Sequence, residues 1–327
     1  MENNGRLKIL STFTGIGGFE LGIEKALGKD NVDFVGFSEI LPSAIAVYRY
    51  HWPEHTNRGD ITKIDAATLP DFDLLVGGFP CQSFSCAGAR RGFEDTRGTL
   101  FFDVARILKE KRPSMVLLEN VKGLLYHDEG RTFKTILGAL DELGYDVQWC
   151  VFNSKYFGVP QNRNRIYIAG HFRGKSIPKI YHSLKKLSEI EKEIGTRLCC
   201  DTLTATKSGQ HGDIFIASTL TAEGAGHWAK TGSNVIEKEN LFRTLTPMEC
   251  ERLQGFPDGW TEWGIASPKD LIPTGEFKIN KAGQNAPHMV FAKGGEEYKL
   301  LDSHRYYLLG NAVSVPVVSY IIKQLYL

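Results

Sequence analysis

The chain has 327 residues, of which 42% are hydrophobic and 24% are charged, as in a soluble globular protein with one large domain and one smaller one. Its formal net charge of +1 excludes a globally basic nucleic-acid binder but leaves room for a local basic face. The sequence shows no secretory signal pattern and no apolar run of the roughly 18 residues that a membrane helix needs, so we expect a cytoplasmic protein without a membrane segment. Its six cysteines show no zinc-type spacing, so we expect free thiols and no metal.

Residues 6 to about 171 alternate between short apolar runs and stretches with helical character. The expected strands are LKILSTF (7–13), VDFVGFSE (32–39), DLLVGG (73–78), SMVLLEN (114–120), DVQWCVF (146–152) and RIYIAGHF (165–172). The expected helices lie at 17–27, 101–111 and 132–144. This alternation predicts an α/β fold, Rossmann-like, with a mainly parallel twisted sheet that helices cover on both faces.

The alternation ends near residue 172. A Lys- and Glu-rich helical stretch, LKKLSEIEKEI, leads into a Gly-, Ser-, Thr- and His-rich segment with two similar pieces, DTLTA (201–205) and STLTA (218–222). Residues 173–243 carry eleven Lys and Arg against eight Asp and Glu, a net charge of +3 that favours a phosphate-bearing partner. We expect a second domain here, although a solvated, loop-rich insertion explains the charge equally well.

The first glycine cluster, FTGIGGF (13–19), closes the first strand and opens the first helix. Such a turn presents backbone N–H groups and a helix N-terminus to a nucleotide-like ligand. A dinucleotide-binding G-x-G-x-x-G pattern starting at Gly15 would need a glycine where the chain has Glu20, which disfavours a nicotinamide oxidoreductase. Glu39 and Asp60 lie at the ends of the next strands and could hold the ribose and the exocyclic amine of an adenosine; each could instead be a cap or turn residue.

Cys81 follows the strand at 73–78, in the stretch GGFPCQSFS. A lone cysteine is most often a small buried hydrophobe, but a thiol in a loop at the ligand edge of a sheet can act as a nucleophile. The next strand delivers Glu119 and Asn120 to the same edge. A carboxyl group at the end of an apolar strand is either a cap or an acid whose pKa burial raises.

The stretch QNRNRIY (161–167) carries three polar side chains at alternate positions, Gln161, Arg163 and Arg165. They would share one face of an extended segment. Such a face could hold an anion or a base.

Seven segments, in order, resemble the motif series of the DNA (cytosine-5-)methyltransferases. They are FTGIGGFELG, GDI, GGFPCQSFS with RGFEDTRGTLFFD, ENVKG, GVPQNRNRIYI, FRTLTPMECERLQGFPD and GNAVSVPVV. The resemblance spans about residues 7 to 322. It implies transfer of a methyl group from S-adenosyl-L-methionine to C5 of a cytosine that is flipped out of double-stranded DNA.

The resemblance also implies residue roles. Cys81 would add to C6 of cytosine, Glu119 would bond or protonate N3, and Arg163 and Arg165 would orient the base and its phosphate. The cofactor would contact Phe13, Ile16, Gly18, Glu39, Asp60, Ile61, Pro80, Leu100 and Asn311. Around the catalytic site the DNA would contact Gln82, Ser85, Arg97 and Gln161, and residues 82–98 resemble a mobile loop that closes over the DNA.

Sequence choice is expected within GQHGDIFIASTLTAEGAGHWAKTG (209–232). Its Gln210, His211 and Lys230 can pair with base edges in the major groove, while Thr219 and Thr221 can lie against the backbone or a thymine methyl. The expected domains are residues 1–171 with 303–327 for catalysis and 172–302 for target recognition. The run at 261–302 is longer than the family pattern and has no assigned role.

Two other functions stay open. A tRNA cytosine-5 methyltransferase carries the same catalytic motifs, although the TLTA-containing segment favours DNA. A non-catalytic DNA-binding relative would lack the cysteine or the glutamate that this chain has. We expect a monomer in a bacterial or phage-infected cell, serving a restriction-modification system or phage self-protection, with any cognate restriction endonuclease acting on the same site without a stable complex.

Overall fold

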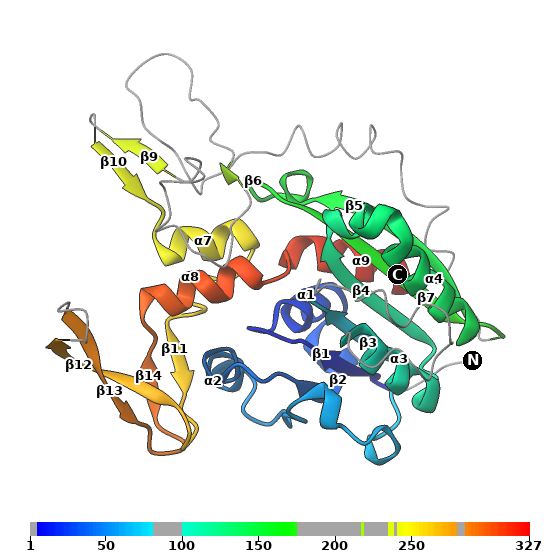
Figure 1. Cartoon of the computed structure of the whole chain (residues 1–327), viewed down its shortest axis with the longest axis horizontal. Coiled ribbons are helices and arrows are strands. Elements are labelled where there is room, and N and C mark those ends of the chain that lie inside the picture. Colours follow the sequence, from blue (N-terminus) through cyan, green and yellow to red (C-terminus); the bar gives the residue numbers. More distant parts are fainter. Residues whose placement is uncertain (1–4, 81–99, 175–216, 219–234, 239–240, 280–284) are drawn as a thin grey trace.

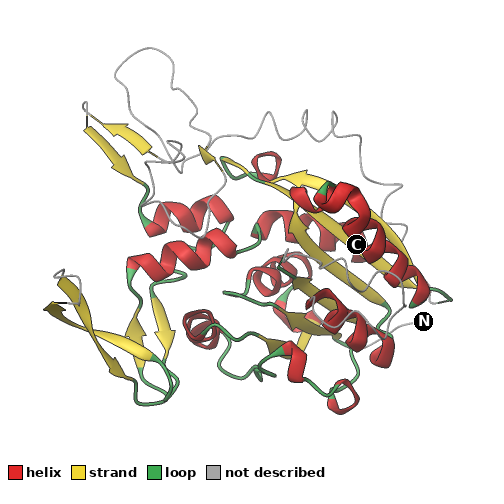
Figure 2. Cartoon of the chain, viewed as in Figure 1, coloured by secondary structure: helices red, strands yellow, loops and turns green. Residues whose placement is uncertain are grey.

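The computed structural model describes residues 5–80, 100–174, 217–218, 235–238, 241–279 and 285–327 (Figure 1). Its helices are α1 (Gly18–Leu27), α2 (Pro42–His51), α3 (Leu100–Lys111), α4 (Arg131–Glu142), α7 (Pro247–Gln254), α8 (Asp302–Asn311) and α9 (Val315–Tyr326) (Figure 2). The first strands are β1 (Leu7–Thr12), β2 (Val32–Ser38), β3 (Leu74–Gly78), β4 (Met115–Val121), β5 (Tyr145–Asn153), β6 (Gln161–Asn162) and β7 (Asn164–Phe172). The later strands are β8 (Ala217–Ser218), β9 (Val235–Lys238), β10 (Leu241–Thr244), β11 (Trp263–Ile265), β12 (Leu271–Ile279), β13 (Asn285–Phe291) and β14 (Glu297–Lys299).

The central sheet has six strands in the order β2-β1-β3-β4-β7-β5. Its first four strands are parallel, whereas β7 runs antiparallel to both β4 and β5. The predicted α/β fold with a mainly parallel sheet is confirmed, and the antiparallel β7 is a departure from an all-parallel arrangement. The cause is the short connection from β5 to β7, because a parallel pairing needs a crossover of a dozen or more residues.

Helices cover both faces of this sheet, as predicted (Figure 1). On one face, α1 and α9 pack against the strand residues Ile9, Leu74, Val76, Met115 and Leu117. On the other face, α3 and α4 pack against Leu10, Leu75, Val116 and Leu118. The two sets alternate along each strand, because successive side chains of a strand point to opposite faces.

A third buried cluster joins distant parts of the chain. It unites the first turn and α2 with residues of α7, α8 and the connection between α7 and β11, among them Ile16, Val47, Tyr48, Trp52, Cys250, Leu253, Phe256, Trp260, Leu308 and Leu309. This core therefore spans the predicted boundary between residues 302 and 303. The division into a catalytic and a recognition domain stays a prediction.

The hairpin of β12 and β13 extends away from the central sheet (Figure 1). It belongs to the run at 261–302 and exposes the large apolar side chains Leu271, Val290 and Phe291.

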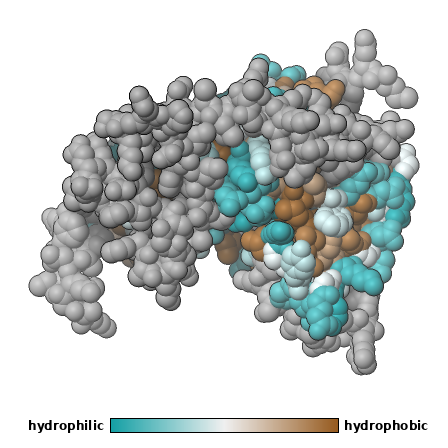
Figure 3. All heavy atoms as spheres, turned by 90° about the horizontal axis from the view of Figure 1, so that it is seen from above, coloured by the Kyte–Doolittle hydropathy of each residue, from teal (hydrophilic) through white to brown (hydrophobic). Residues whose placement is uncertain are grey.

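Figure 3 shows the molecule from above. In the coloured part of this view, hydrophobic and hydrophilic side chains lie next to each other. Among the described residues, the span 302–326 is long and apolar enough to cross a membrane, but 72% of its most apolar window is buried in the fold, as in the core helices of a soluble protein.

Candidate functional site

Glu119 lies at the carboxyl edge of the sheet, where it pairs in register with Gly78 of β3 and Tyr167 of β7. Only 8% of Glu119 is exposed. A Cβ added to Gly78 would lie 3.3 Å from the Glu119 Oε2 atom, so the carboxylate packs over the end of β3. Cys81 lies outside the described residues, but the described chain leads to it through Pro80, from the strand end that Glu119 covers.

Two arginines surround this carboxylate. The Nε atom of Arg165 lies 3.0 Å from Oε1 of Glu119. Burial raises the pKa of Glu119, and the charges of Arg165 and Arg163 offset only part of this effect. Burial, with the neighbouring charge of Arg165, lowers the pKa of Arg163 to about 9. The result is a carboxyl group that holds its proton more tightly than an exposed glutamate, next to two cations.

The Arg163 guanidinium faces the connection between α8 and α9. Its Nη2 atom donates to the carbonyls of Gly310, at 3.1 Å, and Ala312, at 2.8 Å. Arg163 thus links the edge of β7 to the residue next to Asn311. The structure brings Arg163 and Arg165 together beside Glu119, in the pocket that the resemblance implied. It also gives Arg163 contacts to backbone carbonyls that the sequence did not reveal.

Gln161 is the most deeply buried member of the alternating set. Its side chain is fully buried, with Nε2 donating to the Leu253 carbonyl at 3.5 Å. The side chain has no exposed surface in this conformation, and its DNA contact stays a prediction. Leu253 belongs to α7, which lies far from Gln161 in the sequence but next to it in the fold.

Asn120 is a site residue that received no role from the sequence. Its Nδ2 atom donates to the Phe79 carbonyl at 2.8 Å, and its Oδ1 atom accepts from the backbone N–H of Val121 at 2.8 Å. It therefore fixes the end of the strand that leads to Cys81. A polar residue in an otherwise apolar, buried strand was the available signal.

The first turn has unusual backbone geometry. Phe13 has a φ of 51°, and Gly15 and Gly17 have φ of 58° and 83°. A bulky residue with positive φ is rare and strained, and such strain is concentrated at ligand sites. A Cβ on Gly15 would meet nothing within 4 Å, so open space lies beside this turn. The turn therefore offers backbone and room to a bound nucleoside, which fits an adenosine-containing cofactor.

Glu39 binds this turn directly. Its Oε2 atom accepts from the N–H of Gly15 at 2.8 Å, and its Oε1 atom accepts from the N–H groups of Ile40 and Leu41 at 2.8 and 2.9 Å. A carboxylate has about four acceptor sites, so Glu39 retains capacity for a ribose hydroxyl. The two readings of Glu39, turn residue and ribose ligand, are compatible.

Asp60 acts as a cap. Its Oδ1 atom accepts from the N–H and the hydroxyl of Thr62 at 3.0 and 2.8 Å, and these hydrogen bonds lower the pKa of Asp60. The other predicted cofactor residues differ in exposure: Ile16, Gly18 and Ile61 are buried, Leu100 is half-buried, and Pro80 and Asn311 are exposed. A Cβ on Gly18 would lie 2.7 Å from Cγ2 of Val313, so the start of α1 touches the segment that follows Asn311.

Gly17→Ala should destabilise the protein by roughly 2 to 4 kcal/mol, through backbone strain and overpacking. The added Cβ would lie 2.1 Å from Cζ3 of Trp52, at a φ of 83°. Urea unfolding measures this loss. The matched control is Gly138→Ala in α4, where a Cβ meets nothing within 4 Å and should raise the stability by about 0.5 to 1 kcal/mol. Equal stabilities of the two variants would contradict the strain expected for an alanine at position 17.

The remaining predicted residues lie outside the described residues. They are Cys81, Gln82, Ser85, Arg97, Gln210, His211, Thr219, Thr221 and Lys230. Within the described residues, no group of three or more His, Cys, Asp or Glu side chains could hold a metal ion.

Comparison with known proteins gives one family. The model described as C-5 cytosine-specific DNA methylase matches residues 7–215. The type II methyltransferase M1.ScrFI of Lactococcus lactis subsp. cremoris is 42% identical over 288 residues, covering 79% of this chain and 72% of its own. The type II methyltransferase M.SsoII of Shigella sonnei is 35% identical over 350 residues, covering 99% of this chain and 81% of its own.

A solved structure supports the fold. The crystal structure of the S. pombe Dnmt2 methyltransferase matches with a TM-score of 0.61 and 19% sequence identity, covering 97% of this chain and 98% of that chain. At this identity the likeness concerns the fold alone.

Proposed function

The chain belongs to the C-5 cytosine-specific DNA methylase family, and from this premise we propose that Cys81, Glu119, Arg163 and Arg165 act together on a cytosine flipped out of double-stranded DNA. The family uses S-adenosyl-L-methionine and methylates C5 of cytosine. The observation that carries the residue assignment is the register of Gly78 with Glu119, because it sets the chain that leads to Cys81 beside a buried acid and two arginines.

The chemistry follows from these groups. C5 of cytosine is a poor nucleophile, and addition of the Cys81 thiolate to C6 gives it enamine-like electron density. Glu119 donates its proton toward N3 as negative charge develops on the ring. S-adenosyl-L-methionine supplies the electrophilic methyl group. The N3 proton returns to Glu119 as the methyl group bonds to C5, and loss of the C5 proton to water, with release of the Cys81 thiolate, then restores the aromatic ring. Since C6 is inaccessible in a stacked duplex, the base must leave the helix.

Bisulfite sequencing of DNA from cells that express this protein tests the function. Cytosines at one recurrent sequence should resist conversion, and DNA from cells with an empty vector should convert fully. Protected cytosines in tRNA, with none in DNA, would favour the tRNA alternative instead.

Two of the proposed cofactor contacts can be tested by the loss of affinity that their removal should cause. Asp60→Ala should weaken S-adenosyl-L-methionine binding by roughly 1 to 3 kcal/mol, as expected for a ligand group left without its hydrogen bond, and Glu39→Ala should do the same. Calorimetry of the purified variants gives these affinities. Asp65→Ala is the matched control, because Asp65 caps a neighbouring turn by accepting from Ala67 N at 3.0 Å and has no proposed cofactor contact. Unchanged affinity in both Asp60→Ala and Glu39→Ala would place the cofactor elsewhere.

The biological setting is also proposed. The two relatives described above are named type II methyltransferases, which supports a role as the modification enzyme of a restriction-modification system. In this role the protein acts as a monomer in the cytoplasm, and a cognate endonuclease needs only the same DNA site. Phage self-protection would use the same chemistry.

Target choice is proposed to lie in residues 172–245. If a related enzyme with a different known site received this segment, the hybrid should methylate this protein's site, because the catalytic groups handle any flipped cytosine alike. Bisulfite reads of DNA from cells with the hybrid identify the site. An active hybrid that kept the recipient's site would place target choice outside residues 172–245.

A further inference from the structure

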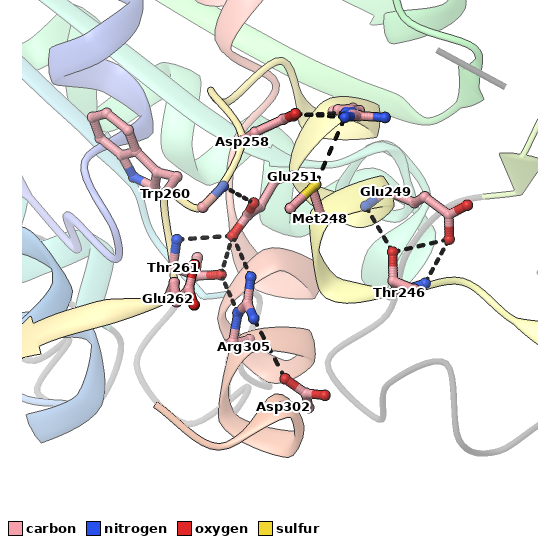
Figure 4. Close-up of polar contacts among 12 residues, drawn as sticks. Thr246, Met248, Glu249, Glu251, Asp258, Trp260, Thr261, Glu262, Asp302 and Arg305 are labelled. Atoms are coloured by element: carbon pink, nitrogen blue, oxygen red, sulfur yellow. Dashed lines mark hydrogen bonds and ion pairs between the residues drawn. The ribbon is translucent and has the colours of Figure 1, made fainter. Parts of the chain in front are cut away.

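The connection between α7 and β11 is held by one buried carboxylate. Glu251 of α7 is fully buried, and its Oε1 atom accepts from the N–H of Thr261 at 2.8 Å and from Nη2 of Arg305 at 3.0 Å (Figure 4). Its Oε2 atom accepts from the N–H of Gly259 at 2.7 Å. Arg305 Nε also donates to the Thr261 hydroxyl at 3.0 Å. These contacts fix residues 257–262 to both α7 and α8.

Trp260 stands in the middle of this fixed connection, and only 8% of it is exposed. Its Nε1 atom donates to the carbonyl of Ile16 at 3.0 Å. Its ring stacks on His51 with a centroid distance of 3.5 Å and an angle of 7°. It also meets Trp52 edge-on, at 5.5 Å and 67°. Trp52 is the side chain that a Cβ on Gly17 would strike.

Trp260 and Trp52 therefore support two successive residues of the first turn, Ile16 and Gly17. Both belong to the strained glycine turn proposed to hold the cofactor. The Ile16 carbonyl is fixed by a donor that lies 244 positions later in the sequence. That donor is held in turn by the buried pair of Glu251 and Arg305, and α8, which carries Arg305, ends at Asn311.

We propose that Trp260 is a positioning residue for S-adenosyl-L-methionine: its indole N–H fixes the Ile16 carbonyl and keeps the first turn in the conformation that accepts the cofactor. This inference rests on the proposed cofactor site and adds to it a residue from the segment predicted for DNA recognition. The physical basis is preorganisation, since a turn already ordered in the free protein loses less conformational freedom when the ligand binds.

Trp260→Phe tests this role, because it keeps an aromatic ring on His51 and removes the N–H donor. The dissociation constant for S-adenosyl-L-methionine, measured by calorimetry on the full chain, should rise about tenfold, the scale of one hydrogen bond. The dissociation constant for duplex DNA and the kcat at saturating cofactor should stay within about twofold of wild type, since Trp260 is buried and its hydrogen bond and ring contacts described above run to Ile16, His51 and Trp52.

Trp263→Phe is the matched control, because Trp263 lies three residues further on and is 38% exposed. It should leave all three quantities unchanged. Cofactor affinity of a folded Trp260→Phe variant within twofold of wild type would overturn the proposal, as would equal losses in cofactor and DNA affinity. A wild-type protein that bound no S-adenosyl-L-methionine would instead refute the proposed function, so the two failures are distinguishable.

A second measurement needs no change at Trp260. Wild-type protein labelled with 5-fluorotryptophan has five tryptophans, and phenylalanine substitutions assign the ¹⁹F signals of Trp149, Trp228 and Trp263. The two remaining signals belong to Trp52 and Trp260. Saturating S-adenosyl-L-methionine should shift both, because both rings support the first turn. If neither signal moves while calorimetry shows binding, the positioning role is wrong.

Discussion

Cys81→Ser is expected to lower methyl transfer by roughly 10,000-fold or more, the scale seen when an enzyme loses its nucleophile. A serine hydroxyl is far less nucleophilic than a thiolate at neutral pH, so C6 of the cytosine would not be attacked. Binding of duplex DNA and of S-adenosyl-L-methionine should remain close to wild type. Transfer of a radiolabelled methyl group to duplex DNA measures the loss, and a tenth of wild-type turnover in the variant would exclude Cys81 as the nucleophile.

Cys150→Ser is the matched control for this substitution. Cys150 is half-buried on β5, and burial raises the pKa of its thiol, so it stays protonated and takes no part in the chemistry. The Cys150→Ser variant should therefore turn over at the wild-type rate. A duplex with 5-fluorocytosine at the target provides an independent check: wild type should form a covalent adduct with it, because fluorine cannot leave as the C5 proton does. Cys81→Ser should form none.

The strands and helices up to residue 172 were predictable because their signal is local. The run LLVGG in β3 is continuously apolar, and α4 repeats its buried residues Phe133, Ile136 and Leu140 at helical spacing. Strand direction is different, because the side-chain pattern of β7 is the same whether it pairs parallel or antiparallel. The helix α2 was not predicted from the sequence. In the structure its Tyr48 and neighbouring residues belong to the third buried cluster.

In the candidate site, too, positions set by local patterns could be predicted, and contacts between distant parts of the chain could not. The place of Glu119 at the edge of the sheet could be predicted from its strand end, and the family resemblance put Arg165 in the same pocket. The buried Gln161 side chain contacts a carbonyl that lies 92 positions later in the chain. The support of the first turn by Trp260 depends on a still longer separation. Such contacts carry no local pattern, so sequence reasoning assigned Gln161 to DNA and gave Trp260 no role.

Glu119→Gln is expected to lower kcat by roughly 100-fold to 10,000-fold, the usual contribution of a general acid. Glutamine fills nearly the same volume beside Arg165, but it cannot give a proton to N3 of the cytosine. Glu110→Gln, at an exposed position near the end of α3, is the matched control and should leave kcat unchanged. A Glu119→Gln variant that kept a third of wild-type kcat would exclude the acid role.

The pH dependence separates the acid role of Glu119 from a purely structural one. Burial raises the pKa of Glu119 above its ordinary value, so in the folded protein the proton is retained to higher pH and is lost as the pH rises through this raised pKa. The ratio of wild-type to Glu119→Gln kcat/KM should therefore be constant below that pKa and fall by about tenfold per pH unit above it, because only the protonated wild-type enzyme is active. Ionisation of Cys81 occurs in both enzymes, so the ratio reduces its contribution to the profile. Measuring kcat/KM of both proteins at rising pH tests this, and a ratio that stays flat up to the pH at which the protein unfolds would mean that Glu119 only shapes the pocket.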